Sequence, residues 1–310
     1  MAFQFDALIA LAGHIAALEA STGRNVGYAR SGRVTPLVSE KARANAERDA
    51  LAAPETWGSR AEYCVMDAVP ESCLQWISPE SASYGVVLDT VSARVDPRAY
   101  VQTLAAAMPG VVLEGATVDM VDPNAGAVHV DGDVFSAGTI VLASGWQIGD
   151  LLAPFAGDWR GIPVKGQAAM FDACAEGLPV IYQDGLYMVP HKGGRIAVGS
   201  TSEKQFDDPF GTDSLLDDVI AKARAICPAL RHARVVERWA GLRPKPPGRE
   251  PVIGPLPGYP NVWLAAGGFK ISFGIAHAVA EVVVSRMSGQ SPVFSLPSSF
   301  DPATRSLEPT

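Results

Sequence analysis

Apolar residues recur at helical spacing near the start of the chain, and this pattern predicts two helices. The first covers Asp6–Ala20, with Gly23 just beyond it as a C-terminal cap. The second, polar and rich in alanine, covers Lys41–Ala53. It should end at Pro54, because proline lacks the backbone N–H that a helix interior needs. Between the two helices, Val26–Val38 is a strand-like run.

Strands and helices alternate after Gly85, which is typical of an α/β fold. Asp96 and Pro97 predict the start of a helix over Arg98–Met108. The apolar run Thr139–Ala143 predicts a strand buried on both faces of a parallel sheet. The other strands expected here are Val86–Leu88, Val111–Glu114, Thr117–Val121 and Ala127–Val130.

A mostly strand-like region follows, with one helix at Ser214–Ile226, and it predicts an antiparallel sheet inserted into the first domain. Its expected strands are Val164–Phe171, Leu186–Pro190, Arg195–Ser200 and Val235–Trp239. We therefore expect two interleaved domains and a loosely held tail. The first domain comprises residues 1–25, 85–160 and 240–290, the second comprises residues 26–84 and 161–239, and the tail is 291–310.

Composition narrows the choice of partners and compartment. The 310 residues carry a formal net charge of -8, which argues against nucleic acid or an anionic membrane as partner. No stretch approaches the roughly 18 apolar residues of a membrane span, and no basic segment precedes an apolar one as in a signal peptide. The four cysteines lack CxxC spacing and the five histidines are isolated, so we expect buried free thiols in a cytoplasmic protein and no metal site.

The most informative local pattern is a strand, a glycine turn and a helix near the C-terminus. Val262–Ala266 is a buried strand, Gly267 and Gly268 form the turn, and Gly274–Met287 is an apolar helix. Glycines let a ligand approach the backbone, and the helix directs its positive dipole end toward that ligand. A phosphate, a carboxylate or the polar edge of a flavin suits such a site, although a plain turn between strand and helix has the same pattern.

Several further motifs occur in an order that resembles the D-amino-acid oxidase and glycine oxidase superfamily. The resemblance rests on segments 239–244 (WAGLRP), 251–255 (PVIGP) and 261–275 near the C-terminus, and on 143–146 (ASGW), 164–167 (VKGQ) and 187–203 before them. It implies that the first domain, residues 1–25, 85–160 and 240–290, is an FAD-binding domain of Rossmann type. The second domain would be an antiparallel substrate domain. It also implies that a small amine or amino acid delivers hydride from its C–H to N5 of FAD.

The resemblance also assigns roles to individual residues. Arg243 would bind the substrate carboxylate from a turn formed with Gly241 and Pro244, and Tyr187 would hydrogen-bond the same group. Ser202 would line the pocket, and Lys270 would place a cation near the flavin. A salt bridge, a core tyrosine and a solvated lysine are the alternatives for Arg243, Tyr187 and Lys270. The predicted cofactor contacts are Val118 (or simply a strand core residue), Ala143, Ser144, Gly145, Gly267, Gly268, Phe269, Ile271 and Gly274.

Two departures from the family pattern weaken the cofactor prediction. The glycine loop has Lys270 in place of the usual arginine and lacks the usual asparagine, and no GxGxxG fingerprint occurs anywhere in the chain. We therefore expect weak or absent FAD binding by this chain, a sheet without its leading strand, and association through the unpaired edge into a homo-oligomer. A start assigned too late, a shortened chain and a decaying gene stay open as reasons. A non-catalytic scaffold and a dehydrogenase with another electron acceptor stay open as functions.

Overall fold

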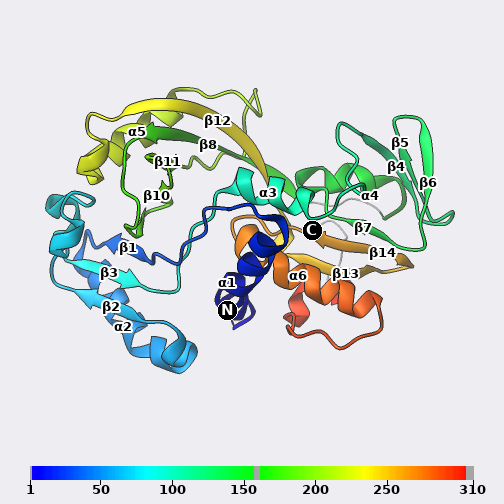
Figure 1. The fold of residues 1–310 in the computed structure, drawn as a ribbon, viewed down its shortest axis with the longest axis horizontal. Helices are drawn as coiled ribbons and strands as arrows, with labels where there is room; N and C mark the ends of the chain where they lie inside the picture. The colour runs from blue at the N-terminus through cyan, green and yellow to red at the C-terminus, as the bar shows by residue number, and fades with distance from the viewer. Residues whose placement is uncertain (1, 157–160, 305–310) are drawn as a thin grey trace.

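The computed structural model describes residues 2–156 and 161–304 and shows a mixed α/β fold, as predicted. Figure 1 shows a large curved sheet in one half of the molecule and two smaller sheets in the other, with α1 and α6 between them. The helices are α1 (Ala2–Thr22), α2 (Glu40–Trp57), α3 (Pro97–Ala106), α4 (Ile148–Ala156), α5 (Ser214–Ile226) and α6 (Ser272–Met287).

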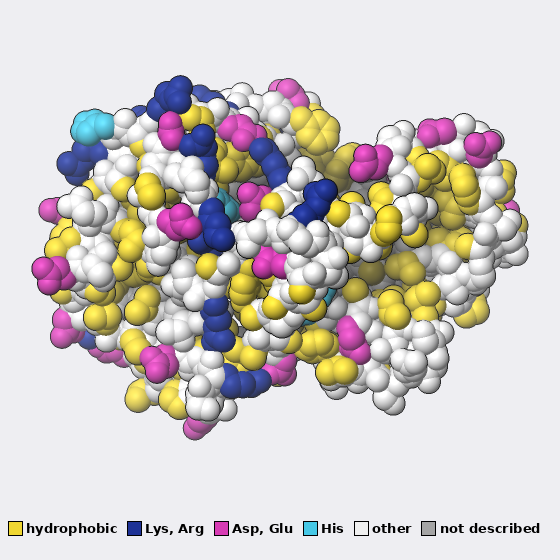
Figure 2. Space-filling view, viewed as in Figure 1, with side chains coloured by type: hydrophobic (Ala, Val, Ile, Leu, Met, Phe, Trp, Pro, Cys, Tyr) yellow, Lys and Arg dark blue, Asp and Glu magenta, His cyan; other side chains and the backbone are white. Residues whose placement is uncertain are grey.

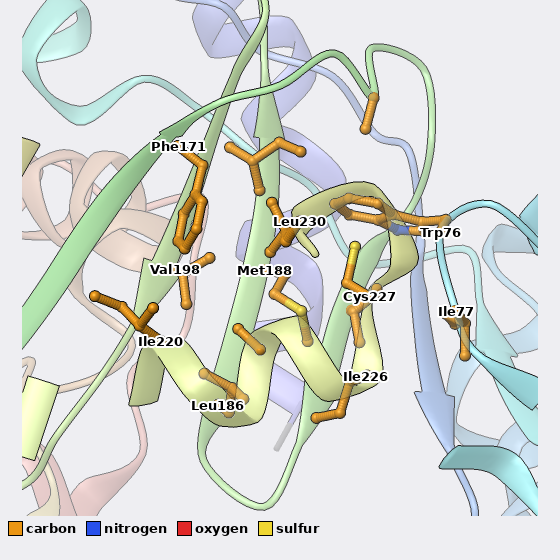
Figure 3. Packing of buried hydrophobic residues seen from close by; sticks show 14 of the residues in the cluster. Trp76, Ile77, Phe171, Leu186, Met188, Val198, Ile220, Ile226, Cys227 and Leu230 are labelled. Atoms are coloured by element: carbon orange, nitrogen blue, oxygen red, sulfur yellow. The ribbon is translucent and has the colours of Figure 1, made fainter. Parts of the chain in front are cut away.

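The large sheet has the strand order β12-β8-β11-β10-β9-β1-β3-β2 and is antiparallel apart from the β1–β9 pair. One of its faces is covered by α5, and Met188, Phe171 and Ile220 are among the buried side chains that form this core (Figure 3). Its strands are β1 (Arg33–Pro36), β2 (Tyr63–Met66), β3 (Val86–Asp89), β8 (Ile162–Asp172), β9 (Val180–Gln183), β10 (Leu186–His191), β11 (Arg195–Gly199) and β12 (Arg234–Lys245).

The second sheet has the order β13-β14-β7, and β7 (Ile140–Leu142) runs parallel to β14 (Tyr259–Ala266). On one face it packs against α4 and the small sheet β4-β5-β6, and on the other against α6 and α1. The other strands of these two sheets are β4 (Val118–Asp122), β5 (Ala127–Val130), β6 (Asp133–Ser136) and β13 (Val252–Leu256).

Two helix predictions need correction. The helix predicted to stop at Pro54 runs through it to Trp57, because Pro54 lies on an exposed side and the Gly58 N–H closes the last turn on the Pro54 carbonyl. The first helix is longer than predicted, and α1 has the length and apolar content of a membrane-spanning helix. That property was missed because charged residues interrupt the run. In the structure, its buried side chains Leu11 and Ile15 pack against Tyr100 of α3.

Three strand predictions also need correction. Val111–Glu114 is not a strand, and its apolar side chains are exposed. β7 is buried on one face only, because Val141 is 40% exposed while Ile140 and Leu142 are buried. β12 continues past Trp239 to Lys245, so Arg243 lies in a strand and not in a turn. Pro244 is compatible with this position because β12 is an edge strand.

Three smaller expectations also differ from the structure: the sheet to which β3 belongs, the burial of the cysteines and the packing of the tail. β3, placed in the cofactor domain by its sequence, belongs to the large sheet. Cys64 and Cys174 are exposed, so only two of the four free thiols are buried as predicted. The described part of the tail, residues 291–304, is not loose, because Phe300 packs into the core around α6. Residues 305–310 lie outside the described residues.

Candidate flavin and substrate site

The two glycine turns predicted to contact the cofactor lie at the same end of the second sheet, where β7 and β14 have their carboxyl ends. Leu142 of β7 is in register with Leu264 of β14 in the parallel pair, so the segments that follow these strands emerge side by side. Gly145 and Gly267 both adopt left-handed backbone angles, with φ of +65° and +75°. The carboxyl ends of adjacent parallel strands are where α/β sheets bind ligands.

The loop that leads from β14 into α6 is too tight for side chains at its glycines. A Cβ on Gly268 would lie 2.4 Å from Ser272 Oγ, and one on Gly267 would lie 2.9 Å from Pro246 Cγ. The Ile271 N–H closes the turn on the Gly268 carbonyl at 2.8 Å. Phe269 takes a left-handed φ of +44°, which is uncommon outside glycine and marks local strain.

An apolar groove of about 380 Å³ starts at this turn and runs between the sheet and α6. Val141, Ala143 and Gly268 line it on one side, and Ser272 and Ile275 are among the α6 residues on the other. Figure 2 shows apolar side chains gathered around a hollow in the half of the molecule that contains β7 and β14. Apolar walls next to a glycine turn and a helix N-terminus fit an aromatic ring system with a polar edge, such as a flavin.

Arg243 projects from β12 over Gly166 of β8, where a Cβ would lie 2.1 Å from Arg243 Nη2. Nη2 donates to Ser200 Oγ at 2.5 Å, and Nη1 donates to the Thr201 carbonyl at 3.4 Å. Burial lowers the pKa of Arg243, and the charge of Glu203 partly opposes that shift. Among the described residues, no carboxylate forms an ion pair with Arg243, so this half-buried guanidinium can accept an anion.

Two tyrosines stand on neighbouring strands of the same sheet. The ring centroids of Tyr182 on β9 and Tyr187 on β10 are 4.6 Å apart. Burial raises the pKa of the Tyr187 phenol, as does its proximity to Tyr182, while Arg33 lowers it. Tyr187 therefore stays protonated at neutral pH and can donate a hydrogen bond.

Lys270 brings the glycine loop and Arg243 into one site. Burial lowers the pKa of the Lys270 ammonium, and the positive charges of Arg243 and Arg249 lower it further. Mutual repulsion of this kind requires that the cations lie close together. A site with two neighbouring cations favours an anionic ligand.

A buried polar network lies behind Arg243, on the α5 side of the sheet. Gln167 Nε2 donates to carboxylate oxygens of Glu203 at 3.1 Å and of Asp213 at 2.8 Å. Lys165, only 3% exposed, lies 3.8 Å from each of the same two carboxylates. Because Thr201 also donates to Glu203, the network holds in place the segment whose carbonyl and hydroxyl bind Arg243.

Two of the predicted site residues, one for the substrate pocket and one for the cofactor, have exposed side chains. Ser202 is exposed, and Ser200, two residues earlier, contacts the arginine instead. Val118 begins β4 in the small sheet, with its side chain exposed. Sequence reasoning also missed Gly166 and Tyr182, which the alternation of side chains along β8 and β9 could have placed on the substrate face. In the part of the chain that the structure describes, no group of three or more His, Cys, Asp or Glu residues could hold a metal ion.

A family model of FAD-dependent oxidoreductases matches residues 5–282, which is most of the chain. The chain belongs to this family. Its cofactor is FAD, in agreement with the resemblance in the motifs.

Glycine oxidases are among the relatives of this chain. The chain is 35% identical over 167 residues to glycine oxidase of Pseudomonas aeruginosa, covering 54% of this chain and 46% of the relative. It is 35% identical over 181 residues to the enzyme of Pseudomonas putida, covering 58% and 49%. The chain thus spans about half the length of the curated relatives it matches.

Solved structures confirm the fold. Glycine oxidase of Geobacillus kaustophilus superposes with a TM-score of 0.84 at 20% identity, covering 96% of this chain and 80% of that one. Iminodiacetate oxidase of Chelativorans sp. superposes with a TM-score of 0.80 at 20% identity, covering 96% and 82%.

Proposed function

We propose that this protein oxidises an amino acid or a related small amine, with Arg243 binding the substrate carboxylate beside the flavin. The observation that carries the proposal is a half-buried arginine without a carboxylate partner among the described residues, near Lys270 of the glycine loop. A buried guanidinium that lacks a counterion binds carboxylates well, since its planar fork can donate two parallel hydrogen bonds.

The residues of the site bind and orient the substrate. Bound FAD supplies the hydride acceptor. Arg243 would hold the carboxylate, and the protonated Tyr187 would donate a hydrogen bond to the same group. Lys270 would place positive charge beside the glycine loop, where negative charge on the cofactor is stabilised. The loop from Gly267 to Ile271, the Ala143–Gly145 turn and Gly274 are the residues that would hold the flavin, with Val118 as a further contact. No general base is needed when the substrate amine is neutral.

The names of relatives support the substrate class. Glycine oxidases and an iminodiacetate oxidase both act on small molecules in which a carboxylate neighbours the amine-bearing carbon, as their names state. We propose the same class for this chain.

We also propose that the protein is a cytoplasmic homo-oligomer with neither nucleic acid nor membrane as partner. The net charge of -8 opposes binding to nucleic acid and to anionic lipid. All four cysteines are free, as expected in a reducing compartment. β7 forms an edge of its sheet among the described residues, and this edge adjoins the apolar groove, so a second copy could cover both.

The direct test is anaerobic reduction of flavin. The purified chain is mixed with FAD, and absorbance is followed after addition of N-methylglycine or of its amide, which has the same C–H bonds but no carboxylate. We expect the acid to bleach the flavin and the amide to be at least tenfold slower. Equal rates, or no bleaching by any amino acid, would contradict the proposal. Titration with FAD in the same experiment measures whether cofactor binding is weak, which stays a prediction.

A further inference from the structure

A second cavity, of about 310 Å³, lies at the end of β12, where the chain turns toward β13. It is lined by Ile162, Lys245 and the turn Pro246–Arg249. The Arg249 N–H closes this turn on the Pro246 carbonyl at 3.1 Å, and Pro246 lies against Gly267 of the glycine loop. The cavity is therefore built on a closed turn that adjoins the proposed flavin site.

Two basic side chains of this cavity, those of Lys245 and Arg249, lack a carboxylate partner. Among the residues that the structure describes, neither forms an ion pair. The chain has 33 acidic and 25 basic residues, so carboxylates are in excess overall, but none is paired with these two cations. Like charges that share a cavity repel each other, and a bound anion would remove that repulsion.

Two further cations lie near the cavity. Burial and the charges of Arg243 and Arg249 lower the pKa of the Lys270 ammonium, so this group lies near both guanidinium groups. Lys245 lies two residues after Arg243 on β12, and alternate residues of a strand point to the same face. Four cations thus surround this end of β12 in a protein whose formal net charge is -8.

The cavity is distinct from the proposed carboxylate site. The guanidinium of Arg243 lies over Gly166, and Gly166 pairs with Gly241, two residues before Arg243. Arg243 therefore leans toward the start of β12. Lys245 pairs with Ile162 at the opposite end of the strand. An anion in the cavity would bind Lys245 and Arg249 without displacing a carboxylate from Arg243.

The residues of the cavity suit a phosphate group. A phosphate carries a charge of about −1.5 to −2 at neutral pH and offers three strong acceptor oxygens, so it can bind two cationic side chains at once. Arginine binds phosphate with two parallel hydrogen bonds, and lysine binds it as a point charge. The volume of about 310 Å³ is at the small end of ligand pockets, as expected for such a group.

We propose that Lys245 and Arg249 form a binding site for a phosphate group beside the glycine loop. A free phosphate and the diphosphate of FAD offer the same chemistry to this site, and the experiment below distinguishes them. The site does not depend on the proposed function, because it requires neither Arg243 nor turnover of a substrate.

Thermal melting in phosphate tests the site directly. The purified chain is melted in about 10 mM phosphate and in sodium chloride of the same ionic strength. For a Kd of about 1 mM, phosphate should raise the melting temperature of the parent by about 2–4 °C more than chloride does. In Lys245→Gln/Arg249→Gln this difference should fall below about 1 °C. Because Lys245 is half-buried and Arg249 is exposed, we expect the double variant to fold like the parent.

Two control variants separate the site from general charge effects. Lys41→Gln/Lys222→Gln removes the same charge from exposed positions of α2 and α5 and should keep the effect of phosphate. Arg243→Lys should keep it as well, because Arg243 leans away from the cavity. Loss of the effect in either control would overturn the site. Equal melting of the parent in phosphate and in chloride would also overturn it, whether or not the double variant folds.

Riboflavin, which has no phosphate, identifies the source of the bound group. FAD should stabilise the parent more than riboflavin does if its diphosphate occupies the site, and Lys245→Gln/Arg249→Gln should then lose that excess. If the excess is the same in both proteins while the effect of phosphate is lost, the site binds free phosphate.

Discussion

Gly166 lies directly beneath the guanidinium of Arg243, and a single added methyl group would displace the arginine. An ideal Cβ at Gly166 would stand 2.1 Å from Nη2 and 2.3 Å from Nη1. Gly241, paired with Gly166 across the two strands, has open space where its own Cβ would be. The two glycines therefore face each other in register but differ in what they contact.

Gly166→Ala should lower kcat/KM for the carboxylate-bearing substrate by about 10- to 100-fold, because it displaces the anchoring group by an ångström or more. Gly241→Ala is the matched control and should change kcat/KM less than about threefold. Both variants should melt within a few degrees of the parent protein. Similar activities for Gly166→Ala and Gly241→Ala would mean that the position of Arg243 does not matter for substrate binding.

His277 should make the folded state sensitive to mild acid. Burial and, to a smaller extent, the charge of His14, whose ring centroid lies 5.1 Å away in a stacked arrangement, together lower its pKa from 6.5 to about 4. The unfolded chain therefore binds more protons than the folded one between pH 6.5 and 4, so stability falls as the pH falls through that range. We expect a lower melting temperature at pH 5 than at pH 7.5, and a smaller difference in His277→Leu. Identical pH dependence in both proteins would show that His277 is not the titrating group.

Self-association of the protein should depend on the apolar surface of α6 beside the groove. Val284 lines this groove and is 60% exposed, so Val284→Glu should introduce a charge into an interface formed there. By light scattering at micromolar concentration, we expect the parent to be a dimer or larger and Val284→Glu to be a monomer. Val101→Glu, at a similarly exposed valine of α3 away from the groove, should not alter assembly. A monomeric parent would contradict the proposal.

Much of the fold could be predicted from periodicity and turn residues. The strand, glycine turn and helix around Gly267 were found because a buried apolar run, two glycines and a helical pattern follow one another without interruption. The extension of β12 through Pro244 could not be predicted, since prolines usually end strands and only the edge position of β12 makes it acceptable.

The site could be predicted only where a motif marked it. Arg243 was found from its motif, but Ser200, Gly166 and Tyr182 contact it or its neighbours through pairing between distant strands. Register between such strands is set by long-range packing and not by local sequence. The exposure of Val141 could not be predicted either, because an apolar run does not show how many faces of the strand are covered by other elements.

Arg243→Lys tests the central claim most directly. The substitution keeps the positive charge but loses the planar fork, and breaking one side of a buried arginine–carboxylate pair costs on the order of 3–5 kcal/mol. In the FAD-loaded protein, kcat/KM for an amino acid or N-substituted glycine should therefore fall by roughly a hundredfold to several thousandfold, with little change in melting temperature. If Arg243→Lys oxidised the substrate as fast as the parent, or if it simply unfolded, Arg243 would be a structural residue and not the carboxylate anchor.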